Sequence, residues 1–376
     1  MNKAEEFIKA RLAERQATGA YRALKPESGL VDFCSNDYMG FARSSALKKL
    51  IDEEIQANKG SLNGSTGSRL LSGNTAYAEK LEQDIAAYHQ SETGLMYNSG
   101  YDANVGLFSS LPQKGDTIIM DELAHASIID GARLSFANRY NFRHNDLESL
   151  EEKLKHAKGN CYVVVESVYS MDGDTSPLRE ILELTELYSA SLIVDEAHAV
   201  GIYKKGVVCK LGLESRVFAR VVTFGKALGC HGAIVLGSTL LRPYLINFSR
   251  SFIYTTAAPF HQLASVKMAY ELLGSADDEI EKLKDNIILF KKLLSGNKYF
   301  TLLTSDSAIQ CVILGDNNKA REVGTKLRNA GLDVRPILSP TVPQGTERLR
   351  ICLHAFNTID EITLLADMLT KYNYAG

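Results

Sequence analysis

The sequence predicts an α/β protein in which a large, mostly parallel sheet is covered by helices and a smaller α+β unit follows toward the C-terminus. Three observations support this prediction. The chain has 376 residues, which is enough for about two domains. Hydrophobic residues make up 45% and charged residues 23%, as in globular proteins with a sizeable core. Between about residues 94 and 256, short apolar runs alternate with helical stretches, which is typical of α/β layering.

Charge and cysteine spacing narrow the class of protein further. Lysine and arginine number 42 against 45 acidic residues, so the basic excess of a nucleic-acid binder is absent and small molecules are the expected partners. The six cysteines lie at least 21 residues apart, which excludes CxxC zinc and redox motifs and predicts reduced thiols. The N-terminal stretch mixes acidic, basic and apolar residues, unlike a signal peptide. We therefore expect a soluble cytoplasmic protein without a membrane span.

The predicted elements divide the chain into an N-terminal segment (1–45), a large α/β domain (46–270) and a C-terminal α+β domain (271–376). Residues 1–19 suit a short amphipathic helix. Helical stretches at 44–57 and 75–90 flank a Gly- and Ser-rich loop at 60–69. Several apolar runs are continuous rather than alternating, which predicts strands buried on both faces. The expected strands are 94–97, 117–120, 162–166, 192–195, 221–224 and 233–236.

The C-terminal part of the chain shows a different order of elements. Residues 262–295 have helical periodicity, and strand-like runs then alternate with helices. The expected strands are 300–304, 309–314 and 347–353, and the expected helices are 317–330 and 358–372. This order predicts a smaller α+β unit that closes over the first domain.

Several common catalytic motifs are missing from the chain. The GxGxxG dinucleotide fingerprint, the GxxxxGK[ST] phosphate loop, the HExxH zinc motif and the GxSxG nucleophile motif are all absent. Residues 195–198 spell DEAH, as in helicases, but the chain offers no phosphate loop to hold a nucleotide. The tetrapeptide therefore needs another explanation.

Asp195 and Lys226 suggest that explanation. Asp195 ends the apolar run 191–195, and Lys226 follows the run 221–224 and lies between Gly225 and Gly229. Ligands of open α/β sheets bind beyond the carboxyl ends of the strands. A lysine that can form a Schiff base and an acid that can pair with a pyridinium nitrogen are what a pyridoxal 5′-phosphate (PLP) site requires. The alternative for Lys226 is a solvated surface lysine, but charged residues seldom follow a buried run without a chemical role.

Together with these two residues, other motifs make the chain resemble the α-oxoamine synthases. These are PLP enzymes that condense an amino acid with an acyl-CoA thioester and release carbon dioxide. The resemblance extends from about Leu12 to the C-terminus, and each motif is specific only in combination with the others. The motifs are 34–40 (CSNDYMG), 98–101 (NSGY), 125–127 (HAS), 167–174 (SVYSMDGD), 195–201 (DEAHAVG), 223–229 (TFGKALG), 340–343 (PTVP) and 347–350 (ERLR).

The resemblance implies a fold type I PLP-dependent transferase, similar to aspartate aminotransferase, that works as a homodimer with its site at the subunit interface. Within the family, the resemblance is strongest to the branch that acts in biotin biosynthesis. That branch joins L-alanine to a pimeloyl thioester of CoA or of a carrier protein. Glycine C-acetyltransferase, 5-aminolevulinate synthase and serine palmitoyltransferase remain alternatives. A cofactor-free binding protein would be expected to lack Lys226 or Asp195, and both are present.

For the cofactor ring, the resemblance implies four catalytic residues and one helper. Lys226 would form the Schiff base and later take the α-proton. Asp195 would hold the ring nitrogen protonated. His198 would reach the phenolic oxygen of the ring together with Ser170. His125 would stack on the ring face and contact the substrate, and its alternative is a helix-capping or surface histidine.

For the cofactor phosphate, the resemblance implies a site at the start of a helix. Gly100 and Tyr101 would offer backbone N–H groups, and Thr223 would add a hydroxyl. A threonine from the partner subunit also reaches this phosphate in the family. Thr255 or Thr256, which follow a strand-like run at 252–254, would supply it here.

For the substrates, the resemblance implies that Arg350 and Asn36 bind the amino-acid carboxylate, because the planar guanidinium matches a carboxylate. The alternative for Arg350 is an ordinary surface arginine. Arg22 and Thr341 would contact the acyl substrate, and no metal is expected. The sequence departs from the family pattern at 351–358 and at 230–231, which affects the expected pocket shape rather than the PLP chemistry.

Overall fold

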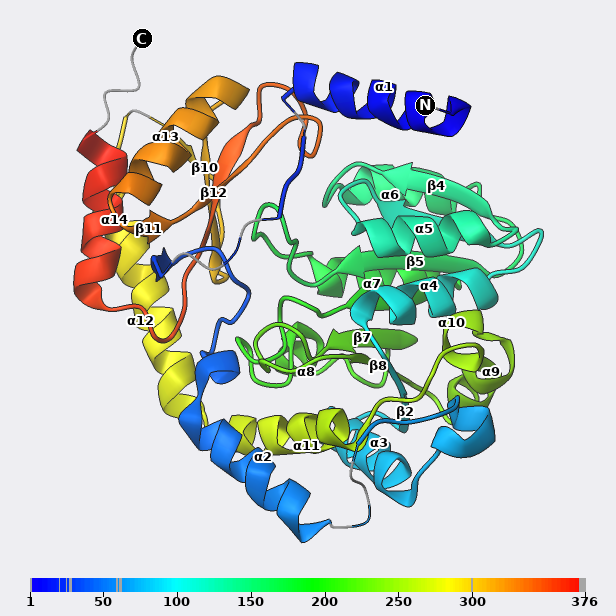
Figure 1. Cartoon of the computed structure of the whole chain (residues 1–376). Coiled ribbons are helices and arrows are strands. Elements are labelled where there is room, and N and C mark those ends of the chain that lie inside the picture. The colour runs from blue at the N-terminus through cyan, green and yellow to red at the C-terminus, as the bar shows by residue number, and fades with distance from the viewer. Residues whose placement is uncertain are drawn as a thin grey trace.

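The computed structural model describes residues 2–19, 21–24, 26, 29–58, 60, 63–298 and 300–371. A large sheet with helices on both sides forms one part of the molecule, and a smaller sheet with its own helices lies beside it (Figure 1). The expected α/β architecture, with a large mostly parallel sheet and a smaller C-terminal α+β unit, is confirmed.

The large sheet has seven strands in the order β2-β8-β7-β6-β5-β3-β4. Strands β3 to β7 pair in parallel, and β8 runs antiparallel between β7 and β2. All six strands expected for this region are present. Edge strand β4 was not predicted, because four of its five side chains are exposed and give no apolar run. The bounds are β2 Thr93–Tyr97, β3 Thr117–Asp121, β4 Asn138–Phe142, β5 Cys161–Glu166, β6 Ser191–Asp195, β7 Ala219–Thr223 and β8 Ala233–Gly237.

Both faces of this sheet are buried, as the continuous apolar runs predicted. Ile118 and Val164 pack with α4 and α5, whereas Ile119 and Val163 face the opposite side with α6 and α7. Alternate residues of a strand point to opposite faces, so each strand contributes to two cores. The covering helices are α4 Gly100–Ser110, α5 Ala126–Leu134, α6 Leu147–Leu154, α7 Leu178–Leu187, α8 Val207–Leu211, α9 Leu241–Phe248 and α10 Arg250–Ile253.

A third group of helices packs beside β2 and joins the two parts of the molecule. Ser44 and Thr75 cap α2 and α3, each accepting a backbone N–H three residues on, which explains where these helices begin. Helix α11 packs along α2. The bounds are α2 Ser45–Ala57, α3 Ala76–Tyr88 and α11 Phe260–Gly274, with short 3₁₀ and π segments at Phe41–Arg43 and Arg69–Gly73.

The smaller sheet is antiparallel, with the order β12-β13-β10-β9, and is covered by α12, α13 and α14. A short parallel pair, β1 with β11, ties the N-terminal segment to this part. The expected domain boundary at 270–271 falls inside α11, so the domain division stays a prediction. The bounds are β1 Val31–Asp32, β9 Thr301–Leu302, β10 Ile309–Ile313, β11 Leu332–Asp333, β12 Arg335–Ile337, β13 Arg348–Cys352, α12 Asp277–Leu293, α13 Asn317–Asn329 and α14 Ile359–Lys371.

One expected strand is wrong. The run at 252–254 was predicted to be strand-like, but Arg250–Ile253 forms helix α10. The backbone N–H of Tyr254 donates to the carbonyl of Arg250, which is a helical turn. Phe252 is buried and Ile253 packs against the same core, whereas Tyr254 is exposed, so packing against the large domain rather than strand pairing holds this segment.

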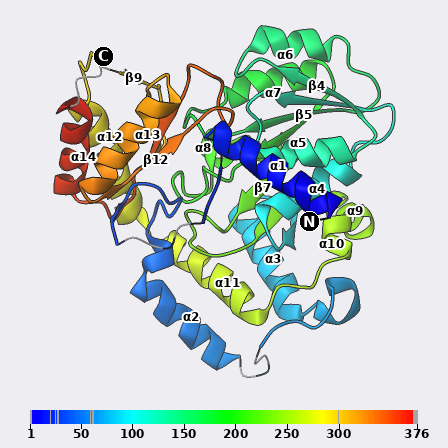
Figure 2. The same cartoon turned by 45° about the horizontal axis from the view of Figure 1, so that its top comes forward.

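Helix α1 (Lys3–Ala17) lies at the surface in both views (Figures 1 and 2). Asn2 and Glu5 form a reciprocal capping box that starts it. None of its residues is buried, and Phe7, Ile8 and Leu12 are exposed. All six cysteines are free thiols. Among the described helices, none is both long and apolar enough for a bilayer crossing.

Candidate active site

Most of the residues predicted for the site lie at the edge of the large sheet where the parallel strands end. Glu166 ends β5, Asp195 ends β6, and the two residues are direct neighbours in the strand pairing. Thr223 ends β7, and Lys226 follows in the next loop. The carboxyl ends of parallel strands are where open α/β sheets bind their ligands.

Lys226 is not a solvated surface lysine. Its Nζ lies 2.6 Å from Nε2 of His198. Burial lowers the pKa of Lys226 to about 8, while the negative charges of Asp195 and Glu166 oppose that decrease. A neutral amine is therefore accessible near physiological pH, which is the form that attacks a carbonyl or accepts a proton.

His198 connects Lys226 to a buried tyrosine. Burial and then the charge of Lys226 hold the pKa of His198 well below its usual value, so the ring is neutral. Its Nδ1 lies 2.8 Å from the hydroxyl of Tyr38, and that hydroxyl donates to Oδ1 of Asn36 at 3.0 Å. With Tyr38 donating onward, Nδ1 carries the ring proton and Nε2 accepts from Lys226.

Arg350 completes this chain from strand β13 of the smaller sheet. Its Nη2 donates to Oδ1 of Asn36 at 3.0 Å, and its Nε donates to the backbone carbonyl of Ser170 at 2.6 Å. Only 9% of Arg350 is exposed. Its alternative as a surface arginine is therefore wrong. Together with a bond from Nη1 to Cys352, these contacts use three of the five N–H donors of the guanidinium, and a carboxylate can bind to the others.

Asp195 is held by partners that the sequence did not reveal. Its Oδ2 accepts from Nδ2 of Asn104 at 2.8 Å, and its Oδ1 accepts from the backbone N–H of Ala197 at 2.9 Å. Asn104 lies inside α4 and also donates to Oγ of Ser127 at 3.0 Å. The fixed carboxylate is 5% exposed. Nothing in the sequence distinguished Asn104 from any polar residue in a helix.

Glu166 is a second functional candidate that was missed. It is 2% exposed, and its Oε1 accepts the backbone N–H of His125 at 2.7 Å. Burial, followed by the adjacent charge of Asp195, raises the pKa of Glu166 to about 8. Its carboxyl group is therefore protonated near neutral pH. An acidic residue ending a fully apolar run next to the run that ends in Asp195 was the available signal.

His125 occupies the capping position of helix α5. Its Nδ1 accepts the backbone N–H of Ser127 at 3.2 Å and lies 2.7 Å from the hydroxyl of the same residue. Burial lowers the pKa of His125. The helix-capping role that was the alternative to a site residue is therefore present, and the stacking of His125 on a cofactor ring stays a prediction.

The expected phosphate site lies at the N-terminus of α4. Helix α4 begins at Gly100, and Ser99 caps it. A Cβ at Gly100 would lie 3.4 Å from the Thr223 hydroxyl oxygen, so the first turn of α4 and Thr223 are within van der Waals range of each other. The side chain of Tyr101 points away to Asp130, which leaves only its backbone for an anion.

The structure places four other predicted residues at the periphery. Thr255 and the backbone of Thr256 each accept a hydrogen bond from Nδ2 of Asn98 at 2.9 Å, next to the start of α4. Arg22 and Thr341 are exposed and are not brought into the Lys226 cluster by any observed contact. Their contacts with an acyl substrate therefore stay predictions.

The departure from the family pattern after Arg350 has a structural explanation. His354 is fully buried, and its Nδ1 lies 3.0 Å from Oδ1 of Asn357. Its Nε2 lies 3.0 Å from the carbonyl of Ser35, directly before Asn36. His354 and Asn357 therefore hold the segment that carries Asn36. His231, the other departure, lines a pocket with Asn98 and Thr255.

Comparisons with known proteins identify the family. Residues 28–369 match the model of aminotransferase class I and II. An 8-amino-7-oxononanoate synthase of Emericella nidulans is 43% identical over 92% of this chain and 90% of its own length. The chain belongs to the α-oxoamine synthases. A serine palmitoyltransferase of S. paucimobilis, solved with a PLP–myriocin adduct, superposes with a TM-score of 0.87 at 28% identity over 98% of both chains. An 8-amino-7-oxononanoate synthase of Francisella tularensis gives 0.79 at 28% identity, covering 92% of this chain and 98% of its own.

As an α-oxoamine synthase, the chain is a PLP-dependent acyltransferase, and its site residues fit that cofactor. The part-buried amine of Lys226 suits the aldehyde of PLP, and the fixed carboxylate of Asp195 at a strand end suits its ring nitrogen. The N-terminus of α4, which begins at Gly100 with the Thr223 hydroxyl nearby, suits its phosphate. The buried Oδ1 of Asn104 has no partner among the described residues. It leaves acceptor capacity beside the carboxylate of Asp195.

Proposed function

We propose that the protein condenses L-alanine with pimeloyl-CoA, or with the pimeloyl thioester of a carrier protein, to give 8-amino-7-oxononanoate, free thiol and carbon dioxide. This reaction belongs to biotin biosynthesis. Relatives that carry this name match nearly the full length of the chain at 35 to 43% identity, which favours this branch of the family.

The observation that supports the proposal best is the hydrogen-bonded chain from Lys226 to Arg350. It runs from the amine of Lys226, which can be neutral near physiological pH, to the buried guanidinium of Arg350. The links between them are His198, Tyr38 and Asn36. An α-amino acid carries a carboxylate one bond from the carbon that reacts. A site for such a substrate needs one cationic anchor and one base at short range, and the two ends of this chain supply them.

Bound PLP supplies an electron sink for the negative charge that develops on the α-carbon of the amino acid. Lys226 would hold the cofactor covalently and, when released, would accept the α-proton at Nζ. Asp195, oriented by Asn104, would accept the N–H of the pyridine nitrogen. His198, with its proton on Nδ1, would leave Nε2 as an acceptor beside Lys226. Arg350 would bind the substrate carboxylate and set the direction of the α-carbon.

We also propose a homodimer with its sites at the interface, acting in the reducing environment of the cytoplasm. Large apolar side chains are exposed around α4, α5 and α10, which is typical of a surface that another protein covers. The side chains of Phe7 and Ile8 on helix α1 are exposed, and no residue of this helix is buried against the rest of the described chain. The exposed apolar side chains near α4, α5 and α10 are Leu70, Leu71, Tyr101, Leu134, Phe136 and Tyr254.

The proposal is tested by measuring thiol release from a matrix of substrates. Glycine, L-alanine, L-serine and L-threonine are each combined with acetyl-CoA, pimeloyl-CoA and palmitoyl-CoA. We expect the highest kcat/KM for L-alanine with pimeloyl-CoA. A higher value for glycine with acetyl-CoA, or for L-serine with palmitoyl-CoA, would contradict the biotin branch while leaving the PLP chemistry intact.

A further inference from the structure

The loop 167–176, which we call the bridging loop, connects the large sheet to the smaller sheet beside the site. The carbonyl of Ser170 accepts from Nε of Arg350 at 2.6 Å. The carbonyl of Gly173 accepts from the hydroxyls of Ser305 and Ser307 at 2.7 and 2.8 Å. Asp172 forms an ion pair with Arg348. The position of Arg350 therefore depends on the position of this loop.

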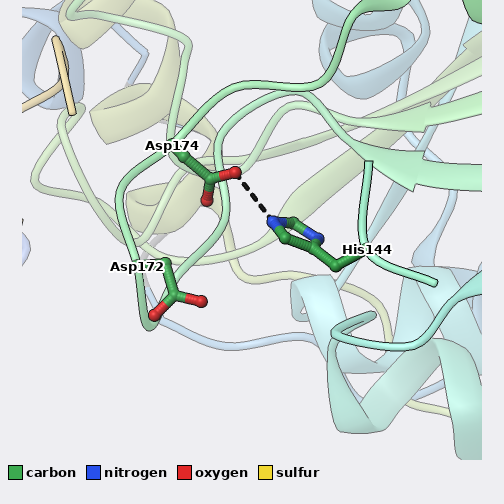
Figure 3. A group of neighbouring side chains, drawn as sticks. All are labelled: His144, Asp172 and Asp174. Carbon is green, nitrogen blue, oxygen red and sulfur yellow. Dashed lines mark hydrogen bonds and ion pairs between the residues drawn. The ribbon is translucent and has the colours of Figure 1, made fainter. Parts of the chain in front are cut away.

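On its other side, the bridging loop is anchored by His144 (Figure 3). Nε2 of His144 lies 2.7 Å from Oδ2 of Asp174 in the loop. Nδ1 of the same ring lies 3.0 Å from Oδ1 of Asp121, the last residue of β3. The ring also packs edge-on against Tyr169 of the loop, with centroids 4.5 Å apart. One imidazole thus connects the large sheet to the loop through two carboxylates.

His144 is positively charged in this arrangement. Each ring nitrogen faces a carboxylate oxygen, so both must carry a proton to form two hydrogen bonds. Hydrogen bonds and charge from Asp121 and Asp174 overcome the opposing effect of burial and raise the pKa of His144 to about 10. Removing this cation would leave the carboxylates of Asp121 and Asp174 facing each other without its charge. Asn145 would be the remaining link between them, since its backbone N–H donates to Asp121 and its Nδ2 donates to Asp174.

His144, Asp172 and Asp174 also lie close enough to hold a metal ion, with their ligand atoms within 4.8 Å of one another. The contacts favour another role. A protonated imidazole has no lone pair for a metal, and Asp172 is already paired with Arg348. The imidazolium itself occupies the position of the cation. Asn145 donates to Asp174 at 2.7 Å and satisfies the same oxygen from a second direction.

We propose that His144 is a positioning residue for amino-acid binding: by pinning Asp174 to Asp121 it fixes the bridging loop, and the Ser170 carbonyl then aims Arg350 at the substrate carboxylate. This inference rests on the proposed role of Arg350. His144 itself touches neither the Lys226 cluster nor the phosphate site in the contacts of the described residues. Its loss should therefore weaken binding of the amino acid without changing the resting cofactor.

The test uses the PLP-loaded enzyme and L-alanine alone, with the absorbance change of the cofactor giving the dissociation constant. We expect His144→Ala to raise that constant about 3- to 30-fold, the usual range for coupled neighbours. The resting spectrum and kcat at saturating L-alanine should stay close to wild type. Asp174→Asn, which keeps the shape of the loop residue, should act in the same direction. Exposed His156→Ala is the matched control and should change nothing.

A double-mutant cycle with Arg350→Lys decides whether His144 acts through Arg350. In the Arg350→Lys background, His144→Ala should add less than about a twofold effect, because the directed guanidinium is already gone. If the two effects multiply, or if neither His144→Ala nor Asp174→Asn weakens binding, the inference is wrong. If wild type holds a stoichiometric metal that His144→Ala loses, the cluster is a metal centre and the inference is overturned. If Arg350→Lys alone leaves binding unchanged, the proposed function of Arg350 fails instead.

Discussion

Glu166→Gln tests whether the buried carboxyl group of Glu166 keeps its proton near neutral pH. Glu166 is buried at the end of β5, beside Asp195 at the end of β6. Its pKa is raised from 4.5 to about 8, chiefly by burial. Between these two values the folded protein keeps a proton that the unfolded chain has released. Glutamine resembles the protonated form, and it can still accept the backbone N–H of His125.

The sign and size of the effect follow from proton linkage. A folded state that binds more protons than the unfolded state loses stability as the pH rises, at up to about 1.4 kcal/mol per pH unit for one group. For Glu166 this loss begins above the unfolded pKa and ends near pH 8. Between pH 6 and pH 9, this one group should therefore lower the free energy of unfolding of wild type by roughly 3 kcal/mol. The Glu166→Gln variant should not show this decrease.

The assay is urea unfolding of both proteins at a fixed concentration and at several values of pH from 6 to 9. We expect the stability of the variant relative to wild type to increase steadily with pH up to about 8 and then level off. Glu152→Gln, at an exposed position of α6, is the control and should show no such trend. A constant difference between Glu166→Gln and wild type at all pH values would refute the assignment of a buried, protonated Glu166.

Three other predictions concern the catalytic residues. Asp195→Asn should bind PLP yet lose turnover on the order of 100-fold or more, because a neutral amide does not favour the protonated ring nitrogen; near-normal steady-state kcat would exclude this role. Mixing Lys226→Ala chains with chains altered at Thr255 and Thr256 should restore part of the activity in heterodimers, and a fully active monomer by light scattering would argue against shared sites. Arg22→Ala should raise the KM for pimeloyl-CoA about 5- to 150-fold without altering the spectral response to L-alanine, whereas a solvated Arg22 predicts no change in either.

The sequence predicted the parts of the fold whose side-chain pattern is set by burial. Strands β5 and β6 are continuous apolar runs because helices cover both faces of the sheet, so they were recognisable. Edge strand β4 carries mostly exposed side chains and gave no signal. The run 252–254 has the composition of a strand, but it has no sheet neighbour and forms a helical turn. Pattern alone does not contain that tertiary information.

The same distinction applies to the site. Lys226 and Asp195 could be predicted because each follows an apolar run, and a strand end places its next residues at the ligand edge. Asn104 and Tyr38 could not, since their roles come from contacts with residues 91 and 160 positions away in the chain. The contacts of His144 with Asp121 and Asp174 also join residues that are distant in the sequence, so they could not be predicted either. Arg22 and Thr341 were expected from the family alone, and their roles stay predictions.

Lys226 is the residue that we expect to carry the cofactor. The most direct measurement is borohydride reduction of the PLP-loaded protein, followed by proteolysis and mass mapping of the labelled peptide. We predict a single pyridoxyl group on the Nζ of Lys226, and none in the Lys226→Ala variant treated in the same way. A stable label on another lysine in wild type would contradict this assignment. So would a wild-type protein that stays colourless and unlabelled after incubation with PLP.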